Sequence, residues 1–159
     1  MNTLREQVMN GGMSLASSRP VISGLGATRT LNSDETGSLI LLDRAAGITI
    51  TLPTAPAPGT FFEFMVSVTC TSNSYKIITG AGTELMVGGI LNCDTDTSDA
   101  LAFWKALVGS SYISVNLDGS TKGGIKGDRI VVTCLNSTTW QVSGVTNGTG
   151  TVDTPFATS

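Results

Sequence analysis

The feature that most constrains this chain is a series of short β-like runs punctuated by turn residues. Glycine, asparagine, aspartate and serine separate the runs, which recur roughly every 8 to 15 residues. This spacing predicts an all-β protein, an antiparallel β-sandwich or a jelly-roll-like barrel, and not alternating βαβ units. The runs span residues 38–43, 48–52, 61–70, 75–79, 84–91, 110–117, 128–135 and 139–145.

Alternation of apolar and polar residues gives two of these runs a predicted buried face. Residues 48–52 read ITITL, which puts isoleucine and leucine on one side and threonine on the other. Residues 61–70 alternate in the same way. Between the first two runs, residues 43–47 have the length of a hairpin turn and end in glycine. Three prolines within residues 53–58 then interrupt strand pairing, because proline lacks the N–H that a sheet ladder needs.

One segment, residues 99–108 (DALAFWKALV), is ambiguous between helix and strand. Ser98 or Asp99 could cap a helix, and Leu101, Trp104 and Val108 would share one face of it. The surrounding β runs and the glycine that follows favour a strand.

The first 33 residues differ from the rest of the chain. They are rich in glycine and serine and show no sustained hydrophobic period. Three arginines against one glutamate give them a local charge of +2, whereas six basic and eleven acidic residues give residues 34–159 a charge of −5. We expect an extended N-terminal arm over residues 1–33, which orders on a partner surface, and a single all-β domain over residues 34–159. A solubilising tail is the alternative.

Composition argues against several classes of function. The chain has no histidine, which excludes Ser-His-Asp and Cys-His nucleophile systems and His-ligated zinc. No apolar run approaches the ~20 residues of a membrane-spanning helix, and the start of the chain has no signal-peptide pattern. The net charge of −3 does not suggest a nucleic-acid binder. We therefore expect a soluble, non-enzymatic protein with no cofactor and no membrane or nucleic-acid partner.

Cys70, Cys93 and Cys134 are odd in number and widely spaced, without a CxxC motif. This pattern does not fit a disulfide framework or a zinc knuckle, so we expect free thiols in a reducing compartment. Cys70 and Cys134 lie in β-like runs and are expected to be buried.

The nearest approach to a metal site is Asp94, Asp96 and Asp99, whose carboxylates could bind Ca²⁺ on a loop. The segment lacks the glycine and the bidentate glutamate of an EF-hand loop, so a solvated turn is favoured and no metal is assigned. Glu63 is the one acid with apolar neighbours on both sides, and it would suit a general acid or, more simply, the outward face of a strand.

Four aromatic residues, Trp104, Trp140, Tyr75 and Tyr112, could form a sugar-stacking platform. Most of them alternate as core residues would, so the core is the favoured location. Neither paired carboxylates nor a phosphate-binding glycine loop adds a candidate for catalysis.

The order of β runs and turns resembles small virion structural proteins of tailed bacteriophages, of the marine or cyanobacterial phage type. The resemblance covers about residues 31–159 and leaves the arm outside it. It is carried by strand and turn patterns, which are not catalytic signatures. These are LNSDETGSLI (31–40), AGITITLP (46–53), PGTFFEF (58–64) and TSNSYKII (71–78), followed by residues 116–119, 123–130, 140–142 and 150–159.

The resemblance implies a capsid decoration (cement) protein, made in the bacterial cytoplasm and located on the head surface of the virion. Such a protein binds the major capsid protein, stabilises the icosahedral head and forms a homotrimer. A head-fibre or tail-associated module that contacts host glycans is the alternative. The residues expected to bind the capsid are the apolar anchors Leu4, Val8, Met9, Val21 and Ile22 and the arginines Arg5, Arg19 and Arg29.

Overall fold

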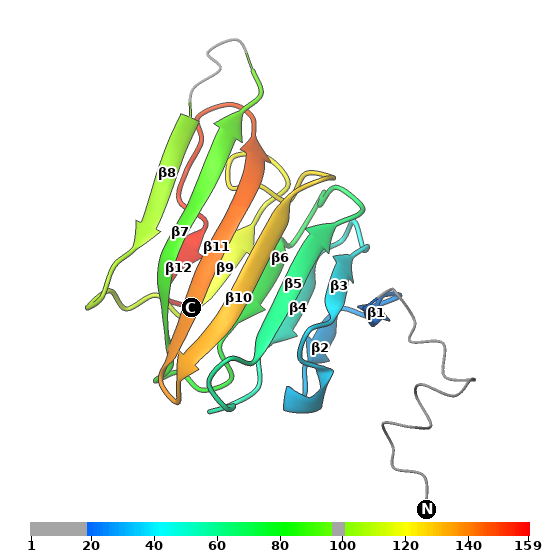
Figure 1. Ribbon diagram of the computed structural model, residues 1–159. Coiled ribbons are helices and arrows are strands. Elements are labelled where there is room, and N and C mark those ends of the chain that lie inside the picture. Colours follow the sequence, from blue (N-terminus) through cyan, green and yellow to red (C-terminus); the bar gives the residue numbers. More distant parts are fainter. Residues whose placement is uncertain (1–18, 97–100) are drawn as a thin grey trace, which may run out of the picture.

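The computed structural model describes residues 19–96 and 101–159 as two packed β-sheets (Figure 1). Strands make up 47% of the chain and helix 2%, which confirms the all-β prediction. The seven-stranded sheet has the order β1 (Val21–Ile22), β3 (Leu39–Leu42), β5 (Phe61–Val66), β10 (Arg129–Asn136), β11 (Thr139–Gly148), β7 (Leu85–Asp94) and β8 (Leu101–Ala106). The five-stranded sheet has the order β12 (Phe156–Ala157), β9 (Ser114–Leu117), β6 (Tyr75–Ile78), β4 (Ile48–Thr51) and β2 (Thr28–Thr30).

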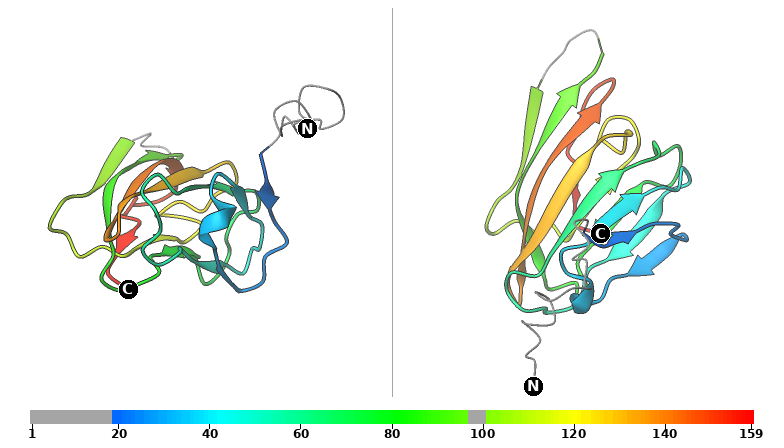
Figure 2. Two further views of the ribbon diagram at one scale, coloured as in Figure 1. Left: turned by 60° about the horizontal axis from the view of Figure 1, so that its bottom comes forward. Right: turned by 45° about the vertical axis from the view of Figure 1, so that its right-hand side comes forward.

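The first six strands alternate between the two sheets, so that this half of the chain winds as a flattened coil (Figure 2). A strand that returns to its sheet after a pass through the other sheet runs in its original direction. Neighbours are therefore parallel: β1 with β3 and β3 with β5 on one side, β2 with β4 and β4 with β6 on the other. A short 3₁₀ turn, η1 (Ser33–Glu35), lies between β2 and β3.

The second half of the chain pairs mostly antiparallel. The β10–β11 hairpin joins the coil through β5, and β7 runs parallel to β11 over ten registered residue pairs. In the five-stranded sheet, β9 is antiparallel to both β6 and β12. The sandwich is thus confirmed, but its sheets are mixed and not purely antiparallel.

Residues 43–47 do not form the expected hairpin. They carry the chain from β3 in one sheet to β4 in the other, because β3 finds its partner in β5 and β4 finds its partner in β6. The turn length and the terminal glycine therefore correctly predict that the chain turns at residues 43–47. They do not indicate in which sheet the next strand lies.

A hydrophobic core fills the space between the sheets. Its largest fully buried side chains include Trp140, Tyr75, Phe62 and Phe64. The isoleucines of residues 48–52 face this core and the threonines face outward, as the alternation predicts. Cys70 and Cys134 are buried free thiols, in agreement with the sequence analysis.

Within residues 19–33, which we expected in the arm, two short strands join the sheets. Val21 and Ile22 pair with β3, and β2 pairs with β4. Leu31 is only 1% exposed and is part of the core. Residues 101–106 form strand β8, which confirms the strand prediction for most of the ambiguous segment.

Candidate binding surface

The outer face of the seven-stranded sheet carries a continuous row of mostly apolar side chains. In β5, the core takes Phe62 and Phe64, which leaves Met65 on the outside. The residue paired with Met65 on each neighbouring strand, and the residues paired with those in turn, form one row across six strands. The resulting apolar row consists of Leu41, Met65, Arg129, Val145, Leu91 and Phe103.

The most exposed apolar side chains of the apolar row are Phe103, which is 59% exposed, and Val145, which is 50% exposed. The Phe103 ring lies against Gly89, where an added Cβ would come within 2.3 Å of the ring. Glycine at position 89 therefore lets an aromatic ring lie flat on the sheet. Contiguous apolar surface of this kind marks an interaction site more often than an isolated exposed leucine does.

Glu63 lies in the next row and is held by two arginines. Its Oε2 accepts a hydrogen bond from Arg19 Nη1 at 2.5 Å, and its Oε1 accepts one from Arg129 Nε at 2.5 Å. The Arg129 and Arg19 guanidinium groups lower the pKa of Glu63 to about 2, although desolvation opposes the shift. In return, the same hydrogen bonds raise the pKa of both arginines.

This geometry assigns Glu63 to the outward face of its strand, the simpler of its two interpretations. A carboxyl group with a pKa of about 2 is ionised at neutral pH and has no proton to donate. Its role in the described structure is to bind Arg19, 44 residues earlier in the chain, to the outer face of β5.

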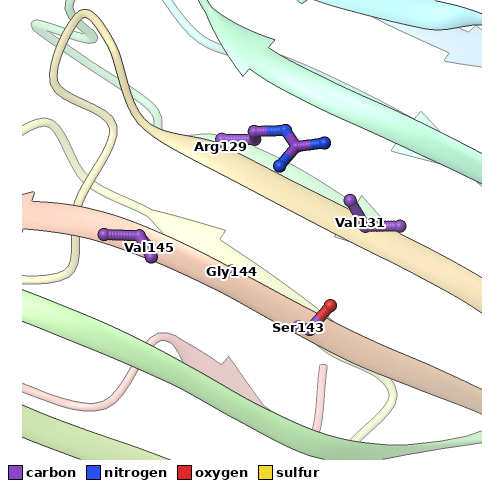
Figure 3. A pocket seen from close by; sticks show the side chains of 5 residues that line it. All are labelled: Arg129, Val131, Ser143, Gly144 and Val145. Atoms are coloured by element: carbon purple, nitrogen blue, oxygen red, sulfur yellow. The ribbon is translucent and has the colours of Figure 1, made fainter.

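A shallow depression of about 340 Å³ lies beside this ion pair (Figure 3). Arg129 and Val131 of β10 line one side, and Ser143, Gly144 and Val145 of β11 line the other. The small side chains on β11 leave space between larger neighbours. The depression can receive one protruding side chain of a partner. Arg129 bonds Glu63 through its Nε, and its Nη groups could donate to a partner carboxylate.

The expected capsid-binding residues fall into two groups. Leu4, Arg5, Val8 and Met9 lie outside the described residues. Val21 is 54% exposed at the β1 edge of the sheet and Ile22 is half-buried. Arg19 pairs with Glu63, and Arg29 pairs with Glu35, so both arginines already have a carboxylate partner within the chain.

The sequence analysis did not single out the outer face of the seven-stranded sheet. A usable signal was present, because residues 39–42 and 61–66 are apolar at most positions of both faces. Such a run indicates either a strand buried on both sides or one with an exposed apolar face. Only the position of the second sheet distinguishes the two.

The acidic loop holds its carboxylates by backbone hydrogen bonds. Asp94 accepts from the Asp96 N–H at 3.1 Å, and Asp96 accepts from the Gly150 N–H at 2.9 Å. Asp99 lies outside the described residues. Within residues 19–96 and 101–159, no group of three or more His, Cys, Asp or Glu side chains could hold a metal ion.

Two buried carboxylates have structural roles. Asp128 accepts hydrogen bonds from the backbone N–H groups of Gly124, Ile125 and Asn147, and burial raises its pKa. Glu84 accepts one from the Trp140 indole at 3.3 Å. Both therefore fix turns and core side chains.

The aromatic residues do not assemble into a stacking platform. Trp140 and Tyr75 are fully buried, and the rings of Tyr112 and Phe156 pack together at 5.7 Å. The core location that the sequence analysis favoured is confirmed for Trp140 and Tyr75.

No helix in the described part of the chain combines the length and apolar character needed to cross a bilayer. Comparison with protein-family models, with curated proteins and with solved structures found no match to this chain.

Proposed function

We propose that the protein is a capsid decoration protein of a tailed bacteriophage and that it binds the head through the outer face of its seven-stranded sheet. The observation that carries the proposal is the apolar row, which crosses six strands on the outer face of the sheet and includes the exposed side chains of Val145 and Phe103. The resemblance noted in the sequence supplies the class of partner, the major capsid protein.

The size of this face suits a protein partner. Seven strands about 4.8 Å apart and roughly six residues long present a flat area of roughly 600 Å². A stable protein interface buries about 800 Å² on each partner. The face supplies most of that area, and an arm that binds the same partner would supply the remainder.

The described part of the chain begins on the same face. Arg19, the first described residue, is attached to Glu63 in the row beside the apolar row. The expected anchors Leu4, Arg5, Val8 and Met9 precede Arg19 by at most 15 residues, or about 50 Å of extended chain. The arm and the sheet face can therefore contact one capsid surface together.

Three-fold assembly remains part of the proposal. When one protomer of a trimer is bound, the other two meet the shell at a high effective concentration. Weak individual contacts then add up to a stable attachment without a large interface on each protomer.

Cosedimentation with empty expanded heads of the phage that encodes the chain tests the proposal. The full chain should bind saturably. Val145→Lys places a second positive charge directly opposite Arg129 in the apolar row and should weaken binding at least about ten-fold, because burying a charge without an opposite partner costs well over 1.4 kcal/mol. The matched control, Thr28→Lys on the exposed face of β2, should bind like the unsubstituted chain.

Two results would overturn the proposal. The full chain could fail to bind heads, in which case saturable binding to a glycan array would support the fibre or tail alternative. Val145→Lys could bind as well as Thr28→Lys, which would remove the sheet face from the contact. A double variant of the full chain, Leu4→Asp with Val8→Asp, tests the arm separately. We expect this variant to lose binding to the heads.

A further inference from the structure

Strand β8 ends the seven-stranded sheet and has a free edge. It pairs with β7 on one side, and no described strand lies on its other side (Figure 1). An edge of this kind presents unpaired backbone N–H and C=O groups, and soluble proteins usually protect it with proline, a bulge or several charges. Residues 101–108 contain no proline and a single charge, Lys105.

β8 and the start of the turn after it carry the most exposed apolar side chains of the described residues. Leu101 and Phe103 of β8 are 70% and 59% exposed, and Leu107 and Val108, directly after the strand, are 60% and 93% exposed. Free backbone groups and apolar side chains therefore lie together on one edge. Another β-strand with an apolar sequence would pair with the backbone groups and cover the apolar side chains.

The sequence of this edge is nearly symmetric about Trp104. Residues 101–107 read LAFWKAL, so that leucine, alanine and a large side chain occur at equal distances on both sides of the tryptophan. In an antiparallel pair, two copies of such a sequence place like residues opposite one another. A strand with this symmetry is complementary to itself.

We propose that β8 binds β8 of a second copy of this chain as an antiparallel pair with a two-fold axis at Trp104. In this register, Leu101 lies opposite Leu107 of the partner subunit, and Ala102 lies opposite Ala106 of the partner subunit. The two seven-stranded sheets join edge to edge into one continuous sheet. Each copy contributes the same patch, as a two-fold interface requires.

The single charge of the edge agrees with this register. Lys105 lies opposite Phe103 of the partner subunit and not opposite its own copy, which avoids like-charge repulsion and allows a cation–π contact.

The contact goes beyond the proposed function and does not depend on it. If the protein decorates a head, the β8 pair would link neighbouring copies on the shell. In solution it doubles whatever assembly the chain otherwise forms, so that a monomer becomes a dimer and a trimer becomes a pair of trimers.

Analytical ultracentrifugation of two double variants tests both the contact and its register. Leu101→Glu with Leu107→Glu places like charges opposite each other across the two-fold axis. Leu101→Glu with Leu107→Lys introduces the same number of charges at the same sites but places opposite charges together. Within one chain the two sites are about 20 Å apart, so they interact little.

Protein concentrations should extend to about 1 mM, because a small edge contact associates weakly. We expect the unsubstituted chain and the Glu/Lys variant to double in mass with concentration. The Glu/Glu variant should associate at least about ten-fold more weakly. Circular dichroism melts should be equal for all three proteins, because both leucines are largely exposed.

Absence of doubling in the unsubstituted chain would overturn the contact. Equal association by the Glu/Glu variant would do the same. Equal loss in both double variants would overturn the antiparallel two-fold register, since only that register distinguishes them.

Discussion

The two outward faces of the sandwich differ in chemistry although they are built in the same way. On the five-stranded sheet, one registered row is Thr28, Thr49, Lys76 and Asn116, which is wholly polar. On the seven-stranded sheet, the apolar row contains five apolar residues and one arginine. Both rows lie on the face of their sheet that points away from the core. Packing of the core therefore does not explain the difference.

A polar outer face is what a solvated sheet needs, and threonine satisfies it without loss of β propensity. The apolar outer face adds nothing to the core and increases the risk of aggregation. Such a surface is expected where another molecule covers it. The comparison thus supports the proposal that the seven-stranded sheet is the binding face, and three predictions test or sharpen it.

The largest effect is expected at Gly88 in β7, on which the seven-stranded face depends. Gly88 has φ +123°, and a Cβ there would lie 2.0 Å from the Val142 carbonyl oxygen of β11. Gly88→Ala should therefore lower the free energy of unfolding by about 3 kcal/mol, measured by urea denaturation.

The neighbouring residue provides the matched control. At Gly89 the obstacle is the Phe103 ring and not backbone, so Gly89→Ala requires only that an exposed ring turns aside. Its cost should be about 1 kcal/mol or less. Equal losses of unfolding free energy at both positions would show that the close approach of β7 to β11 is not the reason why residue 88 must be glycine.

An intermediate and pH-dependent effect is expected at Glu63. Its pKa falls from 4.5 to about 2 on folding, so its ionised form stabilises the fold fully above pH 4.5. That contribution is lost as the pH falls from 4.5 toward 2. Glu63→Gln should cost about 1–2 kcal/mol at pH 7, because the charged hydrogen bonds are lost but both arginines remain partly exposed. Urea midpoints at pH 7, 4 and 2.5 measure this difference, which should be much smaller at pH 2.5 than at pH 7 and should vanish only below pH 2.

Glu35 of η1, which pairs with Arg29 of β2, is the control. It has one arginine partner where Glu63 has two, its Oε2 also accepts a hydrogen bond from the Asn32 N–H, and it is more exposed than Glu63. Glu35→Gln should cost less than about 1 kcal/mol and leave the acid-dependent loss of stability in place. If Glu63→Gln kept the same acid dependence as the unsubstituted chain, Glu63 would not be the group responsible.

The sequence predicted the β class because strand signals are local. Alternation at residues 48–52 correctly assigned the isoleucines to the core and the threonines to the outside. The pairing of strands is not local: β3 pairs with β5 and not with β4, across a proline-rich loop. No turn residue at positions 43–47 records that choice, so a hairpin was the natural but wrong expectation.

The candidate surface was less predictable than the fold. Arg19 and Glu63 are 44 residues apart, and their contact depends on the parallel pairing of β1, β3 and β5. Met65 and Leu41 are apolar, so the sequence assigns them to a core as readily as to an exposed face. The β8 segment was recognised as a strand, but its edge position follows from the order of the whole sheet.

The smallest effect on stability, and the most direct test of the comparison, comes from an exchange of surface character. Val145→Thr with Leu91→Thr makes the apolar row more polar, and Thr28→Val with Thr49→Val makes the polar row more apolar. Because the four sites are at least partly exposed, each pair should change the free energy of unfolding by about 0.5 kcal/mol or less. Binding of the dye ANS should fall in the first protein and rise in the second, measured with Leu101→Glu and Leu107→Glu also present so that the β8 edge contributes little. Unchanged dye binding in both proteins would mean that the two faces do not differ as interaction surfaces, and the argument that places function on the seven-stranded sheet would lose its basis.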